Sequence, residues 1–171
     1  MVNSIQSFVR GAFIVSFFSA LLSLAGCDRV ATGELQVGQS TVADMKLKMG
    51  EPSEVRRNAD REIWVYPLGP EGVKTYFMTV GPTGTLEKID QVLTEANFAR
   101  VQNGMTHDEV VAILGRHGKE QRYAMSINEI TRAWKYNANN ADMFFEVTYD
   151  GNGRVKASAS VDPSLYRGSS K

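Results

Sequence analysis

The ten-residue stretch Thr106–Gly115, THDEVVAILG, contains the signals that begin and end a short helix. Thr106 and Glu109 have the spacing of a capping box, in which the hydroxyl accepts the amide three residues on and the carboxylate accepts the Thr106 amide. Gly115 suits the left-handed residue that ends a helix. The earlier stretch Thr41–Gly50, TVADMKLKMG, has a threonine, an acidic residue and a glycine in the same places. The chain therefore contains an internal repeat.

The same order of marks follows each of these helices. A Trp-x-Tyr motif lies at residues 64–66 and again at 134–136, and a glycine-containing turn follows at 81–84 and at 150–153. The residues between these marks predict strands, which cover 63–66, 74–80, 86–92, 131–137, 143–149 and 155–161. We expect one more short helix, roughly Glu95 to Gln102. The predicted fold class is α+β: two tandem repeats, each with short N-terminal helices packed on one face of an antiparallel sheet.

The second copy resembles the SmpA/OmlA (BamE-like) lipoprotein domain. The residues that carry this resemblance are Gly104-Met105-Thr106, Glu109-Val110, Leu114-Gly115, Trp134, Tyr136 and the run Phe145–Val155. The first copy matches more loosely, because it lacks the Gly-Met-Thr order. The resemblance implies two helices on a three-stranded sheet. A tandem of such units also resembles the fold of β-lactamase inhibitor protein, whose concave sheet grips a partner.

Cys27 is the only cysteine, and it closely follows the apolar run Gly11–Ser23, GAFIVSFFSALLS. This run is shorter than the roughly 20 residues of a membrane span and is typical of a signal-peptide core. The string Leu24-Ala25-Gly26-Cys27 resembles the lipobox of bacterial lipoproteins. The resemblance implies that residues 1–26 are removed as a signal peptide and that Cys27 carries a covalent lipid; no other cofactor is expected. An uncleaved signal anchor is the alternative.

The mature chain then divides into four predicted segments. They are a tether over 27–33, a first BamE-like repeat over 34–93, a second over 94–162 and a flexible tail over 163–171. Two or more acyl chains attach a protein stably to a membrane. The family resemblance implies the outer membrane, with the protein facing the periplasm. Asp28, directly after the lipidated cysteine, favours the periplasmic face of the inner membrane as the alternative.

Charge and composition give no sign of nucleic-acid binding or of catalysis. The 19 cations balance the 19 carboxylates, whereas nucleic-acid binding calls for a basic excess. His107 is predicted at the exposed first position of its helix and His117 in the loop that follows; two such histidines do not have zinc-ligand spacing. No serine or cysteine lies in the context of a catalytic triad. We therefore expect no enzyme and no metal site.

Strand alternation predicts a binding face. It places Trp64, Tyr66, Tyr76 and Met78 under the helices of the first repeat, and it leaves an apolar set on the open face of the sheet. An exposed apolar face marks a protein interface, so the candidate protein-binding residues are Ile63, Val65, Phe77 and, from the second repeat, Phe144. The alternative is that this face packs against the other repeat in a shared core, which the small size of each unit favours.

Two functions are open at this point. The first is a lipoprotein that serves as a scaffold or accessory for another envelope protein, in outer-membrane protein assembly or envelope integrity. The second is a tandem-repeat binder or inhibitor of a soluble periplasmic or extracellular protein. A structural lipoprotein without a defined partner is the remaining possibility.

Overall fold

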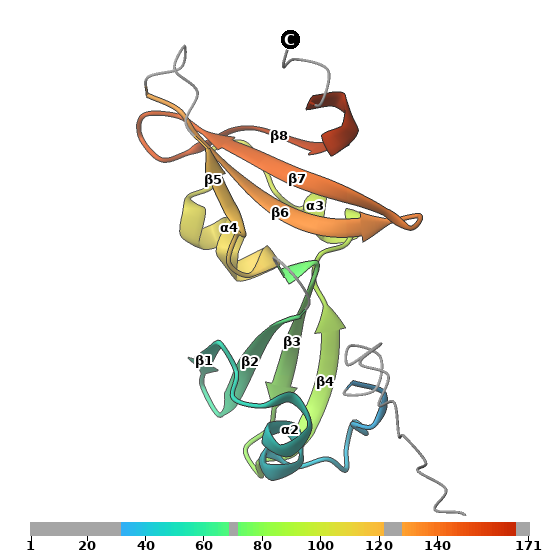
Figure 1. Cartoon of the computed structure of the whole chain (residues 1–171). Coiled ribbons are helices and arrows are strands. Elements are labelled where there is room, and N and C mark those ends of the chain that lie inside the picture. Colours follow the sequence, from blue (N-terminus) through green and yellow to red (C-terminus); the bar gives the residue numbers. More distant parts are fainter. Residues whose placement is uncertain (1–31, 69–71, 122–127, 167–171) are drawn as a thin grey trace, which may run out of the picture.

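The computed structural model describes residues 32–68, 72–121 and 128–166 (Figure 1). Cys27, the signal peptide and most of the tether lie outside the described residues. None of the helices in the described ranges is both long and apolar enough to span a membrane.

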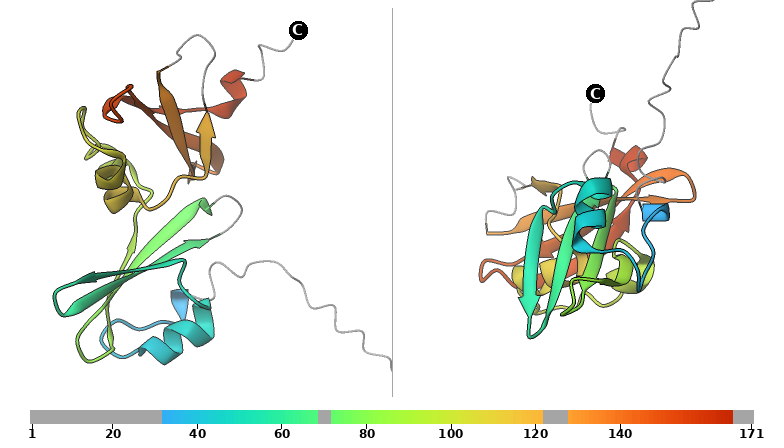
Figure 2. Two further views of the ribbon diagram at one scale, coloured as in Figure 1. Left: turned by 90° about the vertical axis from the view of Figure 1, so that its left-hand side faces the viewer. Right: turned by 90° about the horizontal axis from the view of Figure 1, so that it is seen from below.

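The first unit is a four-stranded antiparallel sheet with helix α2 (Val42–Met49) on one face. The strands lie in chain order and are β1 (Glu54–Asn58), β2 (Arg61–Leu68), β3 (Lys74–Val80) and β4 (Leu86–Gln91). The view from below shows α2 lying across this sheet (Figure 2).

The second unit repeats this plan with two helices. They are α3 (Glu95–Phe98) and α4 (His107–Leu114). Its antiparallel sheet again has the strands in chain order: β5 (Lys119–Gln121), β6 (Ile130–Ala138), β7 (Ala141–Tyr149) and β8 (Val155–Val161). The two units stack, with α3 and α4 between their sheets (Figure 1). The predicted fold class, α+β in two repeats, is confirmed.

Three local predictions differ from the structure. The edge strands β1 and β5 were not expected. The helix that begins at Glu95 ends at Phe98 and not at Gln102, because tighter turns follow, with Val101 N bonded to Phe98 O at 3.0 Å. Both of these apolar side chains reach the core as a result. The predicted flexible tail begins with a helical turn, η2 (Pro163–Tyr166), in which Asp162 accepts the Ser164 amide at 2.8 Å.

Both capping boxes form as predicted. Asp44 accepts the Thr41 amide at 2.8 Å, and Glu109 accepts the Thr106 amide at 2.7 Å. Each threonine hydroxyl in turn accepts the amide of its acidic partner at 3.3 Å. The glycine that ends each helix has a φ of 77°, a conformation that favours glycine. Near-identical caps show that the two helices begin and end in the same way.

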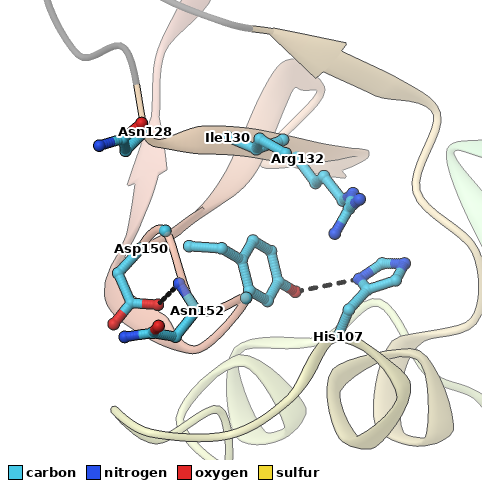
Figure 3. A pocket seen from close by; sticks show the side chains of 9 residues that line it. His107, Asn128, Ile130, Arg132, Asp150 and Asn152 are labelled. Carbon is cyan, nitrogen blue, oxygen red and sulfur yellow. Dashed lines mark hydrogen bonds between the residues drawn. The ribbon is translucent and has the colours of Figure 1, made fainter.

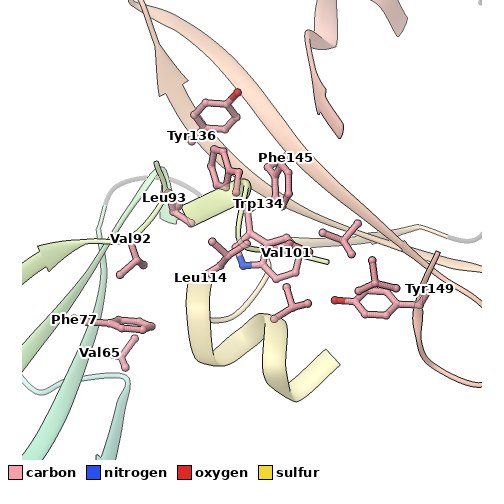
Figure 4. Packing of buried hydrophobic residues seen from close by; sticks show 14 residues of the cluster. Val65, Phe77, Val92, Leu93, Val101, Leu114, Trp134, Tyr136, Phe145 and Tyr149 are labelled. Carbon is pink, nitrogen blue, oxygen red and sulfur yellow. The ribbon is translucent and has the colours of Figure 1, made fainter. Parts of the chain in front are cut away.

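The core has two parts. In the first unit, Met45 of α2 packs with Trp64, Tyr66 and Met78 of the sheet, the face that alternation predicted. The larger part lies in the second unit and also takes in residues of the first (Figure 4). Its residues from the second unit include Phe98, Val110, Leu114, Trp134, Tyr136, Phe145, Val147 and Tyr149.

Apolar side chains join the two units. Val65 and Phe77, on the sheet face opposite α2, belong to the same cluster as Leu114 of α4. The connecting residues Val92 and Leu93 are buried in this cluster as well. A Cβ added at Gly115 would lie 3.0 Å from Thr75 Cγ2 of the first unit. The joint between the units is therefore a shared core.

Candidate functional site

The hairpin registers establish which residues of the two units are equivalent. In the first unit Val80 pairs with Leu86 directly after an irregularity in β3. In the second unit Tyr149 pairs with Val155 directly after the same irregularity in β7. Two isolated bridges support this match, because the N-cap Thr41 bridges to Thr85 and the N-cap of α4 bridges to Arg154. Val80 and Tyr149 are thus equivalent positions.

The same registers match Trp64 with Arg132, and not with Trp134. Trp64 pairs with Met78, two residues before Val80. Arg132 pairs with Val147, two residues before Tyr149. The two Trp-x-Tyr motifs are alike in sequence but not equivalent in the structure. The second motif lies two residues further along its strand, on the same helix-covered face.

A third pair lies at the start of the capped helices. Val42 and His107 both follow the N-cap threonine directly. The first unit thus has three apolar residues on its helix-covered side, all packed in one cluster: Val42, Trp64 and Val80. The second unit has three polar ones at the same positions, which we call the polar trio: His107, Arg132 and Tyr149. A polar side chain at such a position gives up apolar packing. Departures of this kind from the rules of packing are typical of functional sites.

The polar trio lines a pocket of about 640 Å³, within the roughly 300–1,000 Å³ typical of ligand pockets. Figure 3 shows the Arg132 and His107 side chains at one end of the pocket and Asp150 at the other. The remaining wall comes from β6 and the residues just before it and from the turn before β8, and its residues are Asn128, Ile130, Asp150, Gly151, Asn152 and Gly153.

Contacts within the polar trio hold its side chains in place. His107 Nδ1 lies 3.2 Å from the Tyr149 hydroxyl oxygen. The Arg132 guanidinium stands 5.2 Å from the centre of the Tyr149 ring, and its Nε donates to Glu120 at 3.0 Å. Tyr149 is only 1% exposed, and burial raises its pKa to about 12. The phenol is therefore neutral at physiological pH.

His117 lies beside the polar trio. Its ring meets that of His107 edge to face, with centroids 5.1 Å apart. Its Nδ1 is buried, without a hydrogen-bond partner among the described residues. Burial, and then the nearby charge of Arg132, lowers the pKa of both histidines. Both rings are therefore neutral near pH 7.

The contacts of His107 correct one prediction from the sequence. We expected this residue to be exposed, but it is half-buried because its ring packs against those of Tyr149 and His117. His117 lies in the loop after α4, as predicted. Within the described ranges, no group of three or more His, Cys, Asp or Glu side chains is placed to hold a metal ion.

The predicted protein-binding face is not a free surface. Val65 is 2% exposed and Phe77 is 9% exposed, because both pack against the second unit. Ile63 is half-buried against the same cluster. Phe144 lies on the other sheet, half-buried, with Lys119 Nζ 4.7 Å from the centre of its ring. The structure therefore does not bring the four candidates together. The alternative interpretation, a core shared by the two units, applies to Val65 and Phe77.

Sequence reasoning missed the polar trio. The signal was available, since Arg132 has the alternation of Trp134 and so falls on the helix-covered face. Pairing the two Trp-x-Tyr motifs with one another concealed it, because that alignment compares Trp134 with Trp64. An ungapped alignment anchored on the turns at 81–84 and 150–153 compares Arg132 with Ile63, so only the strand registers match Arg132 with Trp64.

Comparison with known proteins gives no family. No family model matches the chain, and no curated protein matches it. Among solved structures, the chain is similar to a putative osmotically inducible lipoprotein, OsmE, at 24% identity and a TM-score of 0.36, over 44% of this chain and 79% of the other. It is also similar to a DUF4309 family protein, YjgB, from Bacillus subtilis subsp. subtilis str. 168, at 14% identity and a TM-score of 0.29, over 80% of this chain and 92% of the other.

Proposed function

We propose that this protein is a lipid-anchored envelope lipoprotein that binds another protein through the pocket of its second unit. The observation that carries the proposal is the polar trio, which stands where the repeated first unit has Val42, Trp64 and Val80. The first unit shows that this fold packs these positions with apolar side chains. A polar set at the same positions in the second unit favours a binding role over a stabilising one.

Binding suits the pocket better than catalysis does. Its lining offers hydrogen-bond donors and acceptors, but it has no serine or cysteine that could act as a nucleophile. The two half-buried histidines lie against one another and against aromatic rings, and not beside a reacting group. Arginine and tyrosine are, in contrast, among the residue types that dominate the energetics of protein interfaces.

The lipid anchor is proposed from the sequence alone. The apolar run before Cys27 and the likeness to a lipobox support acylation there, and the resemblance to the SmpA/OmlA domain supports an envelope location. We place the protein at the outer membrane, facing the periplasm. Serine in place of Cys27 is expected to move the protein from the membrane fraction to the soluble fraction of cells; retention in the membrane fraction contradicts the anchor.

Site-specific photocrosslinking in intact cells tests the binding role. A photoreactive residue replaces Asn152 at the rim of the pocket, and the matched control replaces Thr83, which holds the same place in the turn of the first unit. The expected result is a crosslinked partner from position 152 and none from position 83. Equal crosslinking at both positions, or none at either, contradicts the proposal.

The identity of the captured partner separates the two candidate functions. A membrane-complex subunit indicates a scaffold or accessory, in outer-membrane protein assembly or envelope integrity, which the family resemblance favours. A soluble enzyme indicates an inhibitor or binder, which the tandem arrangement favours.

A further inference from the structure

Arg132 is an unusual residue for its position, because it lies on the helix-covered face of a sheet. Its side chain is only 20% exposed. The equivalent Trp64 is packed in the apolar core of the first unit. A half-buried guanidinium loses hydration unless other groups satisfy it. Binding of a ligand by the guanidinium would explain why an arginine occupies this position.

Among the described residues Glu120 is the charged partner of Arg132, and this contact leaves part of the guanidinium available. The ion pair with Glu120 uses Nε of Arg132, at 3.0 Å. Arginine has five N–H donors in a planar fork, and the side chain lines the pocket. The two terminal nitrogens can therefore donate to a group that enters the pocket.

The neighbouring side chains fix the orientation of the Arg132 guanidinium. It lies over the Tyr149 ring at 5.2 Å, and the Tyr149 hydroxyl is in contact with His107. His117 is the other titratable group beside it, and the pKa of both histidines is lowered, so that neither adds a positive charge near pH 7. A guanidinium fixed in this way matches the planar carboxylate group with little loss of side-chain freedom.

The other end of the pocket has the opposite character. Asp150 lines the pocket at the end away from Arg132 (Figure 3). One of its oxygens accepts the backbone amides of Asn152 and Arg154, at 2.9 and 3.0 Å. The carboxylate and the exposed turn Gly151–Gly153 offer acceptors and donors that suit a polypeptide backbone. A carboxylate is repelled at this end and attracted at the Arg132 end.

We propose that the pocket binds an acidic side chain of a partner protein, with its carboxylate on Arg132 and its backbone along the turn Gly151–Gly153. This inference rests on the proposed function, since it names the chemistry that the partner presents.

NMR titration of the purified protein with two blocked peptides tests this inference. The probes are acetyl-Gly-Gly-Glu-Gly-Gly-amide and its glutamine twin, which differ only in the carboxylate. The glutamate peptide is expected to shift the Nε resonance of Arg132 and the amides of Gly151–Gly153. The glutamine peptide is expected to bind about tenfold more weakly, the size of one charge-assisted hydrogen bond. Equal shifts from the two peptides overturn the inference.

A pair of arginine variants locates the effect. Arg132→Gln is expected to abolish the preference for the glutamate peptide. The matched control is Arg57→Gln, because Arg57 also pairs through Nε with a glutamate at 3.0 Å, but in the first unit. A preference that survives Arg132→Gln, or one that is lost in Arg57→Gln, contradicts the assignment. Should Arg132→Gln fail to fold, Arg132→Lys keeps the charge without the planar fork and is expected to weaken the preference.

Two further outcomes separate the possible failures. Sodium acetate at the same concentration is expected to shift Arg132 but not the amides of Gly151–Gly153; identical shifts from acetate and peptide overturn the assignment to a polypeptide. Crosslinking at Asn152 combined with equal binding of the two peptides overturns the carboxylate inference and leaves the proposed function standing. Preference for the glutamate peptide without any crosslinked partner supports carboxylate binding and contradicts the proposed function.

Discussion

Trp64 and Arg132 hold the same place in two copies of one fold, and they serve different ends. The tryptophan is 5% exposed, and its Nε1 donates to Glu62 at 2.9 Å. The arginine borders a pocket and forms an ion pair with Glu120. Around them the caps, the irregularities in β3 and β7 and the strand order are the same. The fold therefore accommodates either side chain at this position, and the second unit has a charged residue where the first has apolar packing.

The largest loss of stability is expected when the tryptophan of the first unit is replaced by the arginine that the second unit has at this position. Trp64→Arg removes a buried aromatic side chain and places a charge in the apolar cluster of the first unit, with Glu62 as the carboxylate that the tryptophan already contacts. The free energy of unfolding is expected to fall by about 5 kcal/mol, a third or more of the stability of an ordinary domain. Thermal unfolding followed by circular dichroism measures this loss.

Arg132→Ala is the matched control for that variant. A half-buried ion pair contributes little, so the expected loss is about 1 kcal/mol or less. Similar losses in the two variants contradict the division of roles between the two positions.

The joint is expected to be the next most sensitive place. Phe77→Ala leaves a cavity in the core that the two units share, and the expected loss is about 3–5 kcal/mol. Because Phe77 lies against α4, both sheets are expected to unfold together in one denaturant transition. Two separate transitions in the wild-type protein indicate that the units are independent.

The caps should affect both units alike. Thr41→Ala and Thr106→Ala each remove one capping box and are expected to lower the free energy of unfolding by about 1 kcal/mol. Urea unfolding of the two variants measures the losses. A much larger loss for Thr106→Ala indicates that the start of α4 is also needed to hold the pocket in shape.

The pH dependence is the smallest expected effect, and it distinguishes the units because both histidines lie in the second. Burial lowers the pKa of His107 and His117 in the folded protein. As the pH falls through about 6.5, the unfolded chain then binds more protons than the folded one. The free energy of unfolding therefore falls in that range, and the full contribution of the neutral histidines is present only above it. The melting temperature should drop between about pH 7.5 and about pH 5.5.

His117→Gln is expected to flatten that dependence, because it removes the histidine whose Nδ1 is buried without a partner among the described residues. Hydrogen exchange should show the loss of protection first in β6 and β7. Equal loss in β2 and β3 argues against a histidine origin.

Local signals were enough to predict the repeated fold. The capping boxes at Thr41 and Thr106 depend on residues three apart, and the main strands depend on alternation, so both can be recognised without the tertiary structure. The edge strands β1 and β5 escaped prediction because their sequences, EVRRN and KEQ, are short and polar and lack an apolar face.

The site depended on information that local patterns lack. Whether Val65 and Phe77 form a surface or a core depends on where the second unit lies, so the sequence left both interpretations open. Arg132 was missed for a different reason: the likeness of the two Trp-x-Tyr motifs suggested an alignment that the hairpin registers contradict. The register of a strand is determined by its pairing with the neighbouring strand, and a repeated three-residue motif does not determine it.

The most direct test of the central claim gives the second unit the residues of the first. The double variant His107→Val and Arg132→Trp replaces the two members of the polar trio that lie outside the apolar core, since Tyr149 is packed in that core, and crosslinking from Asn152 in intact cells measures what is lost. The account predicts that the variant folds with a melting temperature at least equal to that of the wild type and no longer captures the partner. Capture at the wild-type level, or a melting temperature well below that of the wild type, contradicts the claim that the polar trio serves binding rather than stability.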